Sequence, residues 1–230
     1  MASWRGSLRS SIGTKAIMAV TGTVLFVFVI VHMLGNLQIF LGPDAINQYG
    51  VLLRTLPEAL WAARIVLLVA VVVHVWVAFL LTIENRRARP ERYAVSRAVQ
   101  VGVAPRTLIW TGSIIAAFVV YHLLHFTLGR TDPAHSHLVD ARGRHDVYAM
   151  VVFGFSQWPV SLAYAVAQGL LALHLSHGAS SLFQSLGLAH PRWRPLLDRT
   201  GTALAWIILI GNLSIPAAVM IGLLRVPGGP

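Results

Sequence analysis

Residues Phe28 to Phe40, FVIVHMLGNLQIF, place His32 inside an apolar run that is long enough to cross a membrane. Burying an imidazole in hydrocarbon is costly unless it is paired, so an ionisable residue at this depth indicates a function. The arrangement recurs in three further apolar segments: LLVAVVVHVWVAFLL (67–81) with His74, IIAAFVVYHLLHF (114–126) with His122, and AVAQGLLALHLSHG (165–178) with His174. These four histidines are therefore the first candidates for a functional site.

The composition is that of an integral membrane protein. Of 230 residues, 56% are hydrophobic and only 11% are charged, and the mean hydropathy is +0.69. A soluble domain of this length does not have such a composition. The chain contains no cysteine, which excludes disulfides, thiolate-bound iron–sulfur clusters and covalent c-type haem within it.

The hydropathy pattern predicts an all-α fold, in which residues 1–230 form a single membrane domain with five transmembrane helices. We expect these helices at about 15–41, 58–83, 106–128, 158–186 and 202–224. The first apolar run is longer than that of a signal peptide and lacks a clear cleavage site, so it is interpreted as a retained helix. The links 42–56 and 129–157 are expected to contain some structure at the membrane interface.

The distribution of charge predicts the orientation. Five spans put the two ends of the sequence on opposite sides, and twelve of the 18 Lys and Arg residues then fall on the side of the N-terminus. Basic residues are enriched in cytoplasmic loops, so we expect a cytoplasmic N-terminus in a multi-pass protein of the cell inner membrane. Topology and an acidic lipid or protein surface explain the formal charge of +10, and we expect no nucleic-acid partner.

Depth in the membrane predicts how the histidines pair. His32 lies 17 residues after Lys15, and His122 lies 16 residues after Arg106. Both should therefore be about 24–26 Å from the inner face, at roughly 1.5 Å per residue.

The second and fourth helices enter from the other side. His74 and His174 each lie 16 residues after the expected entry points, Glu58 and Trp158. The sequence thus predicts an outer pair, His32 and His122, and a cytoplasmic-side pair, His74 and His174. Our hypothesis is that each pair ligates the iron of one b-type haem.

Other histidines leave alternatives open. His125 and His177 each lie three residues after a proposed ligand, close to the same helix face, so either could be the ligand instead. Either could also contact a haem propionate or a quinone. His135, His137 and His145 fall in the outer loop, where exposure to solvent is the default expectation.

Several motifs together resemble a known family. They are KAIMAVTG (15–22), FVIVHMLGNLQIFLGPDAINQY (28–49), VVHVWVAFLLTIENRRARP (72–90), TGSIIAAFVVYH (111–122), HLSHGASSLFQSLG (174–187) and NLSIPAAVMIG (212–222). Over nearly its whole length, the chain resembles the five-helix, dihaem cytochrome b anchor of succinate:quinone oxidoreductases and quinol:fumarate reductases. In relatives, the fourth-helix ligand begins an H-x-S-x-G pattern, here at His174. The third-helix ligand follows the glycine of a T-G pair by ten residues, here from Gly112 to His122.

The resemblance implies a cytochrome b subunit of succinate dehydrogenase, a complex of the respiratory chain and the tricarboxylic acid cycle. Such a subunit binds two haems b and a quinone, here expected to be menaquinone. It anchors a flavoprotein subunit, in which succinate is oxidised, and an iron–sulfur subunit, and a higher oligomer of the complex is left open. An anchor of a quinol:fumarate reductase is the first alternative. A haem-free structural or transport protein of the membrane is the second, and it would show no haem absorption bands.

Polar residues near the helix ends are candidates for contacts with propionates or a quinone. They are Ser11, Lys15, Asn36, Gln38, Arg64 and Arg106, with Asn47 and Tyr49 as further quinone candidates on the outer side. A quinone needs only one or two hydrogen-bond donors in an apolar cleft. Interfacial anchoring and helix capping are the competing interpretation for each of these residues.

Overall fold

The computed structural model describes residues 11–87, 103–185, 190 and 192–226, and this part of the chain is helical with short connections. The elements in chain order are α2 (Ser11–Asn36), η1 (Leu37–Leu41), α3 (Pro43–Arg54), α4 (Pro57–Arg87), α5 (Val103–His122), η2 (Leu123–Thr127), α6 (Val147–Ser156), α7 (Trp158–Ser185) and α8 (Arg194–Met220). Five helices are long and apolar enough to span a membrane, and these are the five that the sequence predicts.

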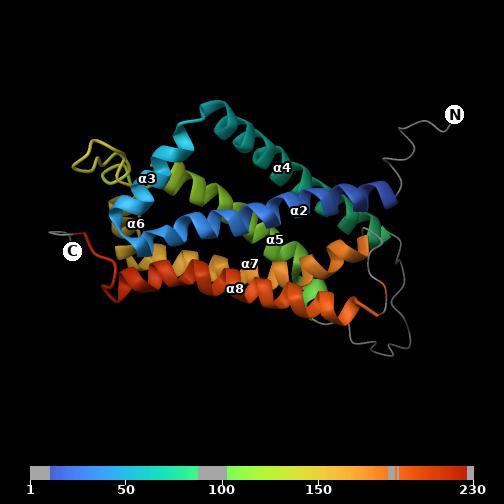
Figure 1. Ribbon diagram of the computed structural model, residues 1–230. Helices are drawn as coiled ribbons and strands as arrows, with labels where there is room; N and C mark the ends of the chain where they lie inside the picture. Colours follow the sequence, from blue (N-terminus) through green and yellow to red (C-terminus); the bar gives the residue numbers. More distant parts are fainter. Residues whose placement is uncertain (1–10, 88–102, 186–189, 191, 227–230) are drawn as a thin grey trace.

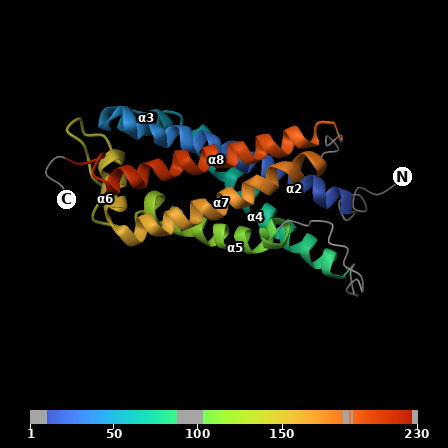
Figure 2. The same cartoon turned by 90° about the horizontal axis from the view of Figure 1, so that it is seen from below.

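Four of the long helices form a ring. α2 packs against α4 and α7, while α5 packs against the same two helices from the other side. As a result, α2 faces α5 across the bundle and α4 faces α7. The fifth span, α8, lies outside this ring and packs mainly on α7 (Figures 1 and 2). This arrangement leaves the first four spans to enclose the bundle interior.

The two ends of the bundle differ. One end, here called the α6 end, carries α3, α6 and the loop between η2 and α6, and α8 finishes there (Figure 1). The other, here called the Lys15 end, carries the start of α2 and the start of α8 (Figure 1). The geometry does not depend on which end is cytoplasmic.

The last span begins earlier than expected. The sequence places it at 202–224, whereas α8 runs from Arg194 to Met220. Pro195 stands in the first turn, where its fixed φ and missing N–H are tolerated, so the helix starts in charged sequence before the apolar run. It ends because Gly222 takes a φ of +71°, and Leu223 N–H then donates to the Ala218 carbonyl.

The predicted interfacial links are ordered at the α6 end. α3 and α6 pack against each other, and a buried cluster that includes Ile39, Ile46, Val152 and Phe155 fills the space beneath them. α6 is a short apolar helix whose N-cap, Asp146, accepts a hydrogen bond from the Ala149 N–H. This end is therefore closed by packed elements.

Some expectations fall outside the described residues. They concern the side chains of Ser11 and Arg106 and the basic segment 88–102.

Candidate functional site

The four histidines of the sequence analysis occupy two levels of the bundle. His74 on α4 and His174 on α7 lie at the level of Thr21 and Thr111, toward the Lys15 end. His32 on α2 and His122 on α5 lie together toward the α6 end. Along α2, the eleven residues from Thr21 to His32 correspond to about 16 Å.

At the first level, each histidine contacts a threonine–glycine step of a neighbouring helix. Nδ1 of His74 is 3.1 Å from Thr21 Oγ1, and Nδ1 of His174 is 3.3 Å from Thr111 Oγ1. A Cβ added at Gly22 would meet His74 Cε1 at 3.3 Å, and one at Gly112 would meet His174 Cε1 at 3.2 Å. The glycines therefore allow the imidazoles to approach the neighbouring backbone closely.

The second level brings two imidazoles into direct contact. The ring centroids of His32 and His122 are 5.7 Å apart, and the ring planes are at 86° to each other. Phe28 stacks on His32 with a centroid separation of 5.2 Å. The Asn36 amide nitrogen lies 3.1 Å from His32 Nε2. Because an amide NH₂ can only donate, this Nε2 carries the lone pair.

Tyr164 of α7 joins the two histidines that compete for the ligand role on α5. Its hydroxyl is 3.2 Å from His122 Nδ1 and 3.1 Å from His125 Nδ1. His125 is buried, and a Cβ added at Gly154 of α6 would lie 3.2 Å from both its Cε1 and its Nε2. The free edge of His125 thus packs on α6, while His122 contacts His32, which favours His122 as the ligand.

The end of the third span departs from regular α-helix. Residues Leu123–Thr127 form a π-helical turn, in which the Leu128 N–H donates to the Leu123 carbonyl at 2.8 Å. Such turns often occur at functional sites. The turn contains His125 and Phe126, whose rings stack at 4.0 Å. No pattern in the sequence indicates this turn.

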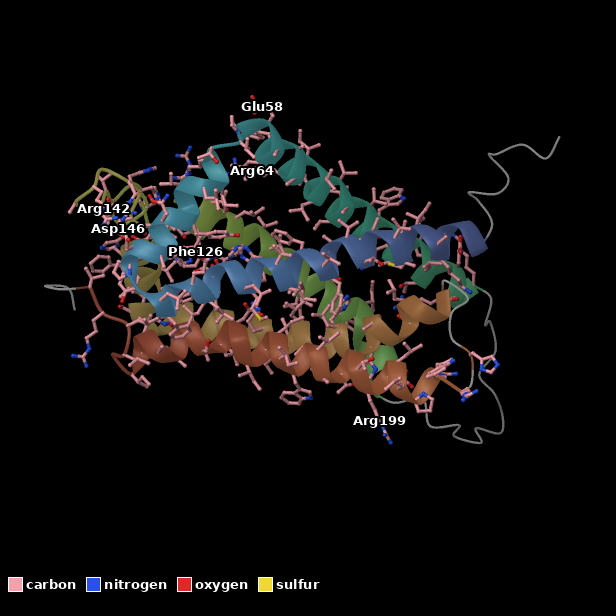
Figure 3. All side chains as sticks on the ribbon, in the orientation of Figure 1. Glu58, Arg64, Phe126, Arg142, Asp146 and Arg199 are labelled. Carbon is pink, nitrogen blue, oxygen red and sulfur yellow. The ribbon has the colours of Figure 1, made fainter. Side chains whose placement is uncertain are left out.

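A cavity of about 390 Å³ lies beside His32 at the α6 end. Its polar lining includes Asn36, Tyr49, Arg54, Arg64, His137 and His145. The two arginines give its lining two cationic groups, and Arg64 lies near the start of α4, where Figure 3 labels it. The guanidinium carbon of Arg64 is 5.1 Å from the centre of the Trp61 ring.

His145 is one of the residues that line this cavity. Its Nε2 is 2.9 Å from the Ser136 carbonyl, which can only accept, so the Nε2 carries the proton. Nδ1 is then the acceptor, and it is buried without a hydrogen-bond partner among the described residues.

An ionic network holds the loop over this end. Asp140 accepts hydrogen bonds from Arg144 Nε at 2.7 Å and from the Arg142 and Arg144 backbone N–H groups at 2.9 Å each. These bonds, led by that of the Arg144 side chain, hold the pKa of Asp140 well below its usual range. Asp44 of α3 pairs with both arginines, and its pKa is also lowered. Arg142 and Asp146 mark this loop in Figure 3.

The remaining candidates take different roles. Asn47 is buried, and its amide nitrogen donates to Asp140 and Asp146, so it supports the loop instead of facing the cavity. Tyr49 and Asn36 do line the cavity. Lys15 is exposed at the start of α2, while Gln38 and His177 are partly buried.

The residues present fit a haem iron at the second level. Metal–imidazole bonds are about 2 Å long, so two imidazoles on one metal have ring centres about 6 Å apart, close to the 5.7 Å between His32 and His122. Within the described residues there is no group of three or more His, Cys, Asp or Glu that could hold a metal ion. Paired histidines suit a macrocycle that supplies the other ligands. At the first level, Gly22 and Gly112 leave room for the imidazoles of His74 and His174 against the neighbouring helices.

Comparison with protein-family models, with curated proteins and with solved structures finds no match to this chain.

Proposed function

We propose that this chain is the dihaem cytochrome b anchor of a succinate dehydrogenase in the cell inner membrane, with its N-terminus cytoplasmic. The observation that carries the proposal is the placement of four intramembrane histidines on four different spans at two levels. Isolated buried imidazoles would be expensive in lipid. Paired on diagonal helices of one ring, they have the arrangement that bis-imidazole haem ligation requires.

The residues of the chain would hold and orient the two haems. His32 and His122 would ligate the outer iron, and His74 and His174 the iron nearer the Lys15 end. Bound haem supplies reversible one-electron transfer, with a potential set by its ligands and surroundings. To ligate iron through Nε2, His32 must exchange its hydrogen bond from Asn36 for the metal.

The α6-end cavity supports a quinone site on the outer side. It adjoins His32, it is partly apolar, and it presents the Tyr49 hydroxyl and two guanidinium groups. Menaquinone is the proposed quinone.

Partners would supply the remaining chemistry. A flavoprotein subunit would oxidise succinate, and an iron–sulfur subunit would carry electrons to the Lys15 end, because this chain has no cysteine with which to hold such clusters. The basic residues that the sequence concentrates on that side would attract an acidic protein surface.

The experiment is purification of the complex through a tag on this chain. We expect co-purified flavin and iron–sulfur protein, and b-type absorption bands that succinate reduces. A complex that shows these bands but is reduced only by quinol would support the fumarate reductase alternative. A purified chain without haem would support the haem-free alternative.

A further inference from the structure

Two threonines inside the membrane contact ring nitrogens of histidines on neighbouring helices. The Thr21 hydroxyl on α2 lies 3.1 Å from His74 Nδ1, and the Thr111 hydroxyl on α5 lies 3.3 Å from His174 Nδ1. These contacts join separate spans, so they are tertiary contacts that fix the imidazoles relative to the bundle.

The Thr21 hydroxyl has one proton, and its partners show which atom donates in the bond to His74 Nδ1. The Thr21 hydroxyl is 2.8 Å from the Ile17 carbonyl and 3.1 Å from the Met18 carbonyl. Carbonyls only accept, so they take the single hydroxyl proton. The hydroxyl oxygen then faces His74 with lone pairs, and Nδ1 must bring the proton.

The second site repeats the first. The Thr111 hydroxyl is 3.0 Å from the Thr107 carbonyl and 3.2 Å from the Leu108 carbonyl. The segments TGTVLFVFVIVH (21–32) and TGSIIAAFVVYH (111–122) share the threonine, the glycine and a histidine at the same spacing. Two separate spans thus place a threonine and a glycine against a histidine of a neighbouring helix in the same way.

We propose that Thr21 and Thr111 are positioning residues that keep the Nδ1 proton on His74 and His174, so that the Nε2 lone pair of each ring faces the bundle interior as a metal ligand. This inference rests on the proposed function, because the metal is the haem iron. Fixing the second ring nitrogen by a hydrogen bond sets the tautomer and raises the basicity of the ligand. Thr21 and Thr111 should therefore stabilise the ferric state of the haem nearer the Lys15 end.

The first test uses potentiometric titration of the purified complex with Thr21→Val, Thr111→Val and the conservative Thr21→Ser. Thr23→Val is the matched control, because the Thr23 hydroxyl makes the same kind of bond to the Ala19 carbonyl without a histidine. We expect both contact-removing valine variants to raise the midpoint potential of the Lys15-end haem only, or to lose that haem only. Thr21→Ser and Thr23→Val should match the wild type. An unchanged potential in both valine variants, or equal changes in Thr21→Val and Thr23→Val, would overturn the proposal.

A second measurement separates this inference from the proposed function. Histidine-selective ¹⁵N NMR of the full chain, purified without haem in detergent at neutral pH, reports which ring nitrogen carries the proton. We expect Nδ1–H for His74 and His174 in the wild-type chain, and loss of this preference for His74 in Thr21→Val. An Nε2–H tautomer in the wild-type chain would contradict the positioning role, even if the complex contains haem. Nδ1–H in a chain that never binds haem would leave the tautomer assignment correct and the proposed function wrong.

Discussion

His32 and His122 face each other across the bundle with ring centroids 5.7 Å apart and nearly perpendicular planes. They come from α2 and α5, which stand on opposite sides of the four-helix ring. Each imidazole also has partners within the bundle, because Phe28 and Asn36 contact His32 and the Tyr164 hydroxyl contacts His122. The contact supports His32 and His122 as one proposed ligand pair.

Replacing His74 or His174 by Ala should remove the Lys15-end haem and spare most of the outer haem. The reason is that the two levels are separated by about 16 Å along α2. Absorption and EPR spectra of each purified variant give the measurement. Loss of both haems, or of neither, would contradict the assignment of these two residues to one iron.

Replacing His122 and His125 separately should distinguish ligand from support. His122→Ala should abolish the outer haem, because no other α5 imidazole contacts His32 among the described residues. His125→Ala should retain it, since the free edge of His125 packs on Gly154. Removing His125 should lower stability, because it leaves a cavity and takes one partner from the Tyr164 hydroxyl. The opposite pattern of haem loss would make His125 the ligand.

Adding a methyl group beside the first-level histidines should disturb them. A Cβ at Gly22 or Gly112 would lie 3.3 or 3.2 Å from a histidine Cε1, so the ring must shift. We expect Gly22→Ala and Gly112→Ala to change the spectrum or lower the occupancy of the Lys15-end haem. The matched control is Gly169→Ala on α7, where an added Cβ meets nothing within 4 Å and the helix should gain about 0.5–1 kcal/mol. A control that behaves like the two test variants would show a general effect of alanine.

The loop at the α6 end should depend on Asp140 over a defined pH range. Its pKa is lowered in the folded protein, so its stabilising contribution is present above the unfolded value of about 3.9 and is lost as the pH falls through the lower, folded value. Trypsin cleavage after Arg142 or Arg144 should therefore stay slow between about pH 6 and 8. Asp140→Asn should speed it several-fold throughout that range.

Asp198→Asn, on α8 at the opposite end, serves as the control for the loop and should leave the cleavage rate unchanged. Wild-type cleavage that accelerates from pH 8 to pH 6 would show that a group other than Asp140 holds the loop.

The sequence was sufficient for the spans because their apolar runs are long and uninterrupted. It was poor at boundaries such as Arg194, because hydropathy records where lipid begins and a helix can start earlier in charged sequence. Position along the helices predicts that His32 lies at the level of His122, because the rise per residue is nearly constant in a helix.

Other parts of the site can be recognised only from the three-dimensional arrangement of the helices. Tyr164, Gly154 and the π-helical turn at Leu123–Thr127 involve contacts between spans or local hydrogen bonding that no spacing rule predicts. The sequence makes Asn47 a candidate for quinone binding on the outer side, yet it is buried and bonded to Asp140 and Asp146. The Thr21–Gly22 and Thr111–Gly112 repeats were visible in the sequence, but their contacts with histidines of other helices were not.

The most direct test of the central claim is the haem-to-protein ratio of the purified complex, measured with a reduced-minus-oxidised spectrum and low-temperature EPR. The account predicts two b-type haems per copy of this chain, both low-spin with two imidazole ligands. A ratio near zero, or haem that persists when all four of His32, His74, His122 and His174 are replaced, would contradict it.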